Sequence, residues 1–363
     1  MLSITETIPI ATQLLLKGAD KSHSYLAWKP LIHPRADETS RKNDEYFLQL
    51  WPFYSEKSRE TFVNAGFGRV TCLYFPLARD DRIIFACKLL TILFLIDDIL
   101  EDMSLEEGEG YNARLMPLMR GDQQPNRKDL LSGYPRMLAH ITAVLKLNSM
   151  FEIGDIPVEF MMYDLWEEMR AASPVLADGI LEPTFTFMHA QTDKARLSIK
   201  ELGHYLVYRE RDVGKASVRI HLQHGALMRF TMDLQLTPEE QTSMVPLERN
   251  CSKQISVVND IWSWEKEVRA YQSGHEEGSV LCSGVKVLAE ATNLDIAATK
   301  RLLQAMVEEW NQVHDRLTAE HIAMGCRSVV KLYMKGLEYQ MSGNQLWSQT
   351  TLRYVDKEVS ASA

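Results

Sequence analysis

The chain has 363 residues, a formal net charge of -9 and 25% charged residues, without a run of Lys and Arg. Nucleic acid and anionic lipid are bound through clustered basic side chains, so we expect neither a nucleic-acid partner nor docking on a membrane surface. Hydrophobic residues make up 45% of the chain, which allows a sizeable core. An anionic small substrate would need positive charge from elsewhere, and bound metal ions are the obvious source.

The N-terminal segment 1–40 contains several prolines and polar residues and is predicted to be partly disordered. It has no basic stretch ahead of an apolar one, so we expect no signal peptide and a cytoplasmic location. The five cysteines are widely spaced and form no CxxC pair, which indicates reduced thiols rather than disulfides or a zinc site. Residues 41–363 show no repeat and no clear linker, so we predict one domain.

Hydrophobic residues recur with helical spacing almost everywhere, and no stretch alternates as a strand would, which predicts an all-α fold. A strongly apolar helix is expected over residues 82–103. Lys88 interrupts it, and acidic residues end it before the roughly 20 apolar residues that a membrane span needs, so we expect no membrane insertion. A helix that is apolar all round belongs at the centre of a bundle. Further helices are predicted near 158–172, 180–197, 199–212, 226–233, 247–269, 295–321 and 327–343.

The apolar helix ends in the sequence Asp97-Asp98-Ile99-Leu100-Glu101-Asp102. Asp97 and Glu101 are four residues apart and therefore face the same side of the helix. Crowded carboxylates are costly unless a cation lies between them, and an oxygen-only ligand set suits Mg²⁺. The alternative interpretation is a helix that simply runs out into solvent, and this motif alone does not decide between the two.

A second polar stripe follows in the sequence ISVVNDIWSWEKEV, residues 255–268. Asn259, Ser263 and Glu267 are spaced by four residues and stack on one helical face, between apolar neighbours. An amide, a hydroxyl and a carboxylate offer oxygen ligands that again fit Mg²⁺. A solvated polar stripe would look the same. Two such sites on separate helices, however, can hold a diphosphate from two sides.

The sequence DDILE together with NDIWSWEKE resembles the paired metal motifs of class I terpene synthases. The similarity goes beyond these motifs and extends from about Trp51 to Tyr354. The chain resembles the fungal sesquiterpene cyclases of the aristolochene synthase type in the blocks YDLWEEMRA, LEPTFTFMHAQTD, LGHYLVYRERDVGK and GLEYQMSGNQLWSQTTLRY. This resemblance implies a class I terpenoid synthase α-helical bundle around a central apolar cavity.

The resemblance also implies a role for each matching residue. Asp97 would be the primary ligand of two magnesium ions and Glu101 would complete the motif, while Asn259, Ser263 and Glu267 would hold a third ion. Arg209 would sense the diphosphate, and Asp212 would relay that contact. The further diphosphate donors would be Lys266, Arg353 and Tyr354. The aromatic rings that line the cavity would be Tyr74, Phe94, Phe187 and Trp347.

The implied reaction converts farnesyl diphosphate, by Mg²⁺-assisted ionisation, into diphosphate and a bicyclic sesquiterpene such as aristolochene. A carbocation over an aromatic face is stabilised without meeting a nucleophile that could trap it. The expected partners are the substrate, the released diphosphate and a second copy of the chain in a homodimer. A different sesquiterpene product is an open alternative. A chain-elongating prenyltransferase would carry a second DDxxD motif, where this chain has NDIWSWEKE.

Two segments depart from the family pattern, at about 128–155 and 217–225. They are predicted to be insertions, and one hypothesis is a gene model that retains intron sequence. They motivate the rival interpretation of a catalytically impaired bundle. We expect that deleting about 129–155 leaves folding intact. Deleting about 218–224 is expected to restore the helical register, because Leu227 and Phe230 can rejoin the buried face only if the extra turns are removed or bulge out.

Overall fold

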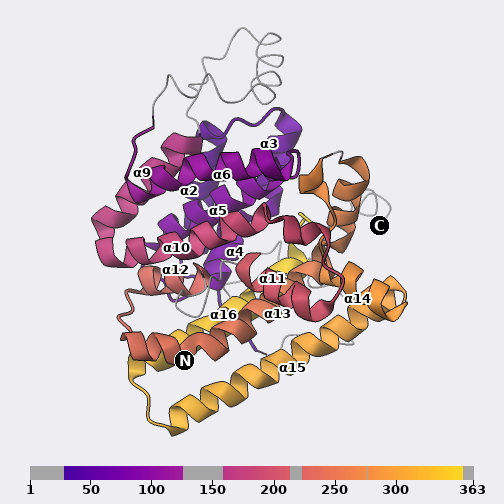
Figure 1. Cartoon of the computed structure of the whole chain (residues 1–363). Helices are drawn as coiled ribbons and strands as arrows, with labels where there is room; N and C mark the ends of the chain where they lie inside the picture. The colour runs from indigo at the N-terminus through magenta and orange to yellow at the C-terminus, as the bar shows by residue number, and fades with distance from the viewer. Residues whose placement is uncertain (1–27, 126–157, 213–222, 275, 355–363) are drawn as a thin grey trace.

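The computed structural model describes residues 28–125, 158–212, 223–274 and 276–354, and within these ranges it contains helices and no strand (Figure 1). The all-α prediction is thereby confirmed. The helices are α2 (Ala36–Leu50), α3 (Glu56–Ala65), α4 (Phe67–Tyr74), α5 (Ile83–Leu100), α6 (Leu105–Arg120), α9 (Val158–Ala172), α10 (Pro174–Gln191), α11 (Leu202–Asp212), α12 (Gln223–Met232), α13 (Pro238–Ser273), α14 (Gly284–Thr292), α15 (Ile296–Ala323) and α16 (Ser328–Thr350), with short 3₁₀ turns η2 (Lys194–Leu197) and η3 (Glu277–Ser279).

The apolar helix α5 lies inside the bundle, as its composition predicts. Residues on all sides of it are buried, from Ile83 at its start to Leu100 at its end. It packs against α2, α4, α9 and α12, so it has no face left for solvent over most of its length. Among the described helices, none is long and apolar enough to cross a bilayer.

The second half of the bundle is built on α13, which has 36 residues. Its start is fixed by a capping box, in which the Thr237 side chain accepts from the backbone N–H of Glu240 while Glu240 accepts from that of Thr237. Figure 1 shows α13 running beside α16 and α15, and both pack against it. The two polar motifs therefore lie on two long helices of one bundle.

Helix α5 ends next to the carboxylates, and a short turn leads from it to α6. Ser104 caps α6 through a second capping box with Glu107, so a new helix must begin at Leu105. The turn at residues 101–104 lets α5 end with its acidic residues at the helix terminus. This places Asp97 in the last turn of α5, where its side chain can reach a cavity.

Several helices differ from the sequence predictions. Helices α2, α3, α4, α6 and α14 were not predicted, and α10, α13 and α16 are longer than expected or begin earlier. Gly66 explains the pair α3 and α4: with φ of 66° it ends the first helix and starts the second, a conformation that favours glycine. Short helices separated by a single residue give too few repeats for periodicity to reveal.

The ordered bundle begins before residue 41. The Trp28 indole N–H donates to Asp315 on α15 at 3.0 Å, His33 is buried, and α2 already begins at Ala36. The predicted boundary at residue 40 is therefore too late. Residues 1–27 lie outside the described part of the chain.

The predicted insertion 128–155 also lies outside the described residues, and so does most of 217–225. Helix α12 begins at Gln223, inside this second segment, and is described. Leu227 and Phe230 are fully buried in it, at 0% exposure, with residues 217–225 present in the chain. Both residues thus reach the core with this segment in place, and the gain expected from deleting about 218–224 stays a prediction.

Deleting residues 129–155 is expected to leave the melting temperature unchanged or raise it. The guanidinium of Arg170 on α9 donates to the carbonyl of Met119 near the end of α6. Val158, at the start of α9, therefore lies about 18 Å from Arg170 along the axis of α9. Residues 121–125 turn back against Pro117, so residues 126–128 and 156–157 remain to join them to α9 after deletion, and this link can span about 20 Å. Thermal unfolding of the two chains checks this, and a large drop in melting temperature would identify the segment as part of the fold.

Candidate active site

One cavity is lined by residues from α5, α10, α11, α13 and α16 and by the segment 278–282. Leu90, Leu93 and Phe94 line it one to two turns before Asp97 on α5, so the apolar part lies deeper along this helix than the carboxylates. Asp97 of the first motif and Asn259 of the second line this same cavity. The fold thus brings together two polar stripes that are far apart in sequence.

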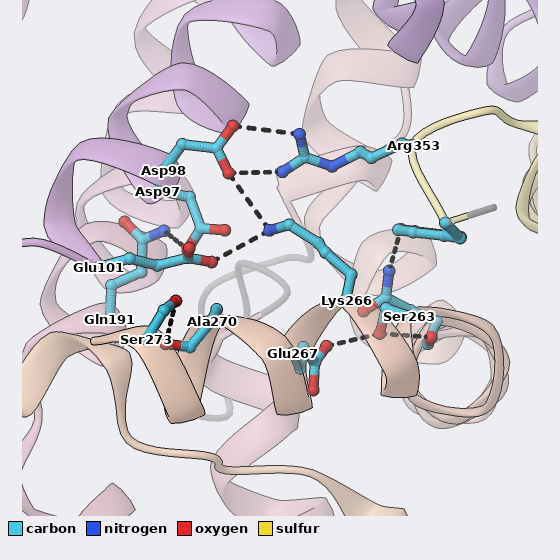
Figure 2. A network of polar contacts seen from close by, with 12 residues as sticks. Asp97, Asp98, Glu101, Gln191, Ser263, Lys266, Glu267, Ala270, Ser273 and Arg353 are labelled. Atoms are coloured by element: carbon cyan, nitrogen blue, oxygen red, sulfur yellow. Dashed lines mark hydrogen bonds and ion pairs between the residues drawn. The ribbon is translucent and has the colours of Figure 1, made fainter. Parts of the chain in front are cut away.

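The first stripe is a cluster of three carboxylates. Oxygen atoms of Asp97, Asp98 and Glu101 lie within 4.8 Å of one another. Asp97 and Glu101 line the cavity, whereas Asp98 does not. Asp97 accepts a hydrogen bond of 2.8 Å from the Gln191 amide (Figure 2). Close carboxylates of this kind are a ligand set for a hard divalent cation.

Two basic side chains contact the carboxylate cluster on the side away from Gln191 (Figure 2). Arg353 forms a bidentate pair with Asp98, with N–O distances of 3.0 and 2.6 Å. Lys266 on α13 bridges Asp98 at 3.3 Å and Glu101 at 3.0 Å. Burial by itself raises the pKa of Asp98, but the positive charges of Arg353 and Lys266 outweigh it and lower that pKa to about 2. Asp98 is therefore ionised and holds Arg353 in place.

The second stripe lies along α13. Ser263 Oγ donates to the backbone carbonyl of Asn259 at 2.8 Å and contacts the Glu267 carboxyl at 2.5 Å. The Asn259 amide donates to the Tyr354 hydroxyl at 2.7 Å. Burial, followed by the negative charge of Asp260, raises the pKa of Glu267 to about 7. A buried carboxyl of this kind favours a cation beside it, which fits a metal ligand.

Arg209 stands beside this second stripe. Its guanidinium donates to Asn259 Oδ1 at 3.3 Å and to Asp260 Oδ1 at 3.2 Å. Asp212 is the last residue of α11, but its side chain is outside the described part of the structure, so its predicted relay role stays a prediction. Arg209, Lys266, Arg353 and Tyr354 all line the cavity. Positive charge and hydrogen-bond donors therefore surround the place where both polar stripes meet.

The four predicted aromatic residues, Tyr74, Phe94, Phe187 and Trp347, all line the cavity. Phe94 and Trp347 lie 6.0 Å apart between ring centroids. The Trp347 indole N–H donates to the carbonyl of Ala65 at 3.1 Å, and the Tyr74 hydroxyl donates to Asn344 at 2.7 Å. The polar atoms of these two rings are thus engaged by the protein.

Sequence reasoning missed several residues of the cavity wall, among them Gln191, Arg196, Tyr208 and Asn344. A signal for Gln191 was present. It lies four residues after Phe187 on α10, just as Asp97 lies one turn after Phe94 on α5. In both helices a polar residue follows an aromatic residue of the cavity by about one helical turn. Arg196 donates to the Gln191 carbonyl at 2.6 Å and closes this end of α10.

Comparison with known proteins agrees with this architecture. The family model for terpene synthase family 2, C-terminal metal binding, matches residues 88–312. Aristolochene synthase from Penicillium roqueforti is 54% identical over 329 residues, which are 90% of this chain and 86% of that protein. Aristolochene synthase from Aspergillus terreus is 50% identical over 328 residues, 90% of this chain and 92% of that protein. The crystal structure of the Penicillium roqueforti enzyme superposes with a TM-score of 0.71 at 53% identity, covering 90% of this chain and 98% of that one.

A helical bundle whose metal-binding carboxylates border an aromatic cavity defines a class I terpene synthase, and the chain belongs to this family. The close matches over nine-tenths of the chain are to aristolochene synthases, the type that the sequence blocks predict.

Proposed function

We propose that the protein cyclises farnesyl diphosphate to aristolochene and diphosphate, with Mg²⁺ as its metal and three ions bound. The observation that carries this proposal is the meeting of two oxygen-rich stripes, three basic side chains and the Tyr354 hydroxyl at one aromatic cavity. The identity of about half of all residues to proteins named aristolochene synthase supports the choice of product.

The donor set fits Mg²⁺. Asp97 and Glu101 offer carboxylate oxygens, and Asn259, Ser263 and Glu267 offer an amide, a hydroxyl and a carboxylate. Hard oxygen ligands, few in number, are typical for Mg²⁺ that also contacts substrate phosphates. When bound, Mg²⁺ would neutralise the charge that develops on the departing diphosphate.

The residues of the chain would share the remaining work. Arg209, Lys266 and Arg353 would bind the diphosphate oxygens through charge-assisted N–H donors. Burial raises the pKa of Tyr354 to about 12, so its hydroxyl stays protonated at neutral pH and can donate. These donors strengthen their contacts as the carbon–oxygen bond breaks and negative charge moves onto the leaving group, which lowers the barrier.

The released farnesyl cation would stay in the apolar part of the cavity. Phe94, Phe187 and Trp347 would stabilise positive charge through their ring faces. Burial raises the pKa of the Tyr74 hydroxyl well above its usual value, so it stays a neutral phenol and a weak nucleophile, and the lone pair of the Trp347 indole nitrogen is part of the ring's π system. The cation would therefore cyclise before a nucleophile traps it.

The test is incubation of the purified full-length chain with farnesyl diphosphate and Mg²⁺, followed by product identification by mass spectrometry. Aristolochene should form with Mg²⁺, stop with a chelator and return when Mg²⁺ is added in excess. Zinc should substitute poorly, because the ligands are hard oxygens. Turnover that continues in the chelator would refute metal-assisted ionisation, and a different hydrocarbon would correct the product alone.

Replacing Gly278 by Ala is expected to divert product toward alcohols. The segment 278–282 lines the cavity, and the Gly278 N–H donates to the carbonyl of Met103 at 3.0 Å. A Cβ at this position would collide with the carbonyl oxygens of Leu100 and Met103, at the end of the metal-binding helix. The segment would have to lift, and water would enter and capture the cation, releasing a proton. We expect the alcohol fraction to rise about tenfold.

Gly179→Ala on α10 is the matched control, because a Cβ there meets no atom within 4 Å. Its products should equal those of the parent chain. Unchanged products in both variants would show that the segment 278–282 does not keep water out.

Homodimer formation and a cytoplasmic location are further proposals. They rest on the sequence and can be checked by sedimentation of the purified chain and by cell fractionation.

A further inference from the structure

Asp260 is a buried carboxylate that the reaction described above does not use. It follows the proposed metal ligand Asn259 on α13, but it does not line the cavity and its exposure is 1%. A buried charge of this kind is costly unless it is paired and hydrogen-bonded. Its partners therefore indicate what it does.

The two oxygens of Asp260 serve different partners. Oδ2 accepts from the Tyr205 hydroxyl at 2.6 Å and from the backbone N–H of Gly284 at 2.9 Å. Oδ1 accepts from the Arg209 guanidinium at 3.2 Å. Tyr205 and Arg209 are four residues apart on α11, so one carboxylate contacts two successive turns of that helix. Three helices, α11, α13 and the start of α14, meet at this one side chain.

The approach of Gly284 is close. A Cβ on Gly284 would lie 2.8 Å from Asp260 Oδ2 and 3.0 Å from the Tyr205 ring. Only a residue without a side chain lets the backbone N–H reach the carboxylate in this way. Oδ2 is thus anchored by the fold, and Oδ1 is held at a fixed place beside Arg209.

We propose that Asp260 is a positioning residue that holds the Arg209 guanidinium at the cavity, ready to bind the substrate diphosphate. This inference rests on the proposed function, because it needs Arg209 to bind diphosphate. A free arginine side chain samples many rotamers, and ordering it on binding lowers affinity. Asp260 holds the Nη2 end of the guanidinium from outside the cavity, while Arg209 itself lines the cavity where the ligand would bind.

The substitution Asp260→Asn separates this role from a purely structural one. The Gly284 N–H can only donate, so the asparagine oxygen must take the Oδ2 position, where it can still accept from Tyr205 and Gly284. The asparagine NH₂ group then faces the Arg209 guanidinium, donor against donor. The anchor to the fold is kept, and the contact to Arg209 is lost.

The test measures binding of inorganic diphosphate in the presence of Mg²⁺ by calorimetry on the full chain, so it does not depend on turnover. Four proteins are compared: the parent, Asp260→Asn, Arg209→Gln and the double variant. We expect Asp260→Asn to weaken diphosphate binding about tenfold when Arg209 is present and to have no further effect in the Arg209→Gln background. Melting temperatures are recorded for all four.

Tyr205→Phe is the control for the fold. It removes a partner of Oδ2 and should lower the melting temperature, yet it should weaken diphosphate binding less than Asp260→Asn does. Equal loss of affinity from Asp260→Asn with and without Arg209 would overturn the inference, and so would no loss in either background. If the parent chain binds no diphosphate with Mg²⁺, the proposed function is wrong, and the inference that depends on it is wrong as well.

Discussion

Asp97→Asn is expected to lower kcat/KM for farnesyl diphosphate about 1,000-fold, which corresponds to about 4 kcal/mol of transition-state stabilisation. Asp97 lines the cavity beside Glu101, and a neutral amide in its place removes one of the negative charges that would hold the metal. The Gln191 amide donates to the same carboxylate and would keep the new side chain in position. The loss should therefore reflect charge rather than geometry.

Asp98→Asn should cost much less activity, about tenfold. Asp98 does not line the cavity, and its oxygens are engaged by Arg353 and Lys266. Its removal frees Arg353 and should lower the melting temperature, because a partly buried pair loses one member. The exposed Asp102 provides the matched control, and Asp102→Asn should leave both quantities unchanged.

Steady-state kinetics at saturating Mg²⁺ and thermal unfolding measure these effects. Equal and mild losses at Asp97 and Asp98 would show that the metal assignment is wrong. A larger loss at Asp98 would instead mean that Asp98, and not Asp97, is the main metal ligand.

Glu267→Gln is expected to lower turnover about 100-fold, or about 3 kcal/mol, and to raise the Mg²⁺ concentration needed for half-maximal rate. Glu267 supplies the carboxylate of the second stripe, while Asn259 and Ser263 offer only neutral oxygen atoms. Without it, a divalent cation at this stripe would meet no negative ligand from the stripe itself. A Mg²⁺ titration of the initial rate separates weaker metal binding from slower chemistry.

The matched control lies on the same helix. Glu265 is 53% exposed and pairs with Lys300 at 2.8 Å on the outside of the bundle. Glu265→Gln removes the same charge two residues away and should change neither the rate nor the Mg²⁺ requirement. If the two variants behave alike, net charge on α13 matters and the proposed ligand does not.

The sequence alone determined the all-α class, the buried apolar helix and the composition of both polar stripes. These are local properties. Residues spaced by three and four share a helical face whatever surrounds the helix, so Asp97 with Glu101, and Asn259 with Ser263 and Glu267, could be grouped without a structure. The family resemblance added the basic and aromatic residues, all of which line the cavity where their side chains are described.

Only the tertiary structure decided the contacts between helices. Gln191 meets Asp97, Arg353 pairs with Asp98, and Asp260 anchors Arg209, across sequence separations of 94, 255 and 51 residues. No periodicity within one helix predicts which face of another helix it will meet, since that depends on how the whole core packs. The burial of Leu227 and Phe230 on α12 was likewise decided by packing, here against α10 and α16.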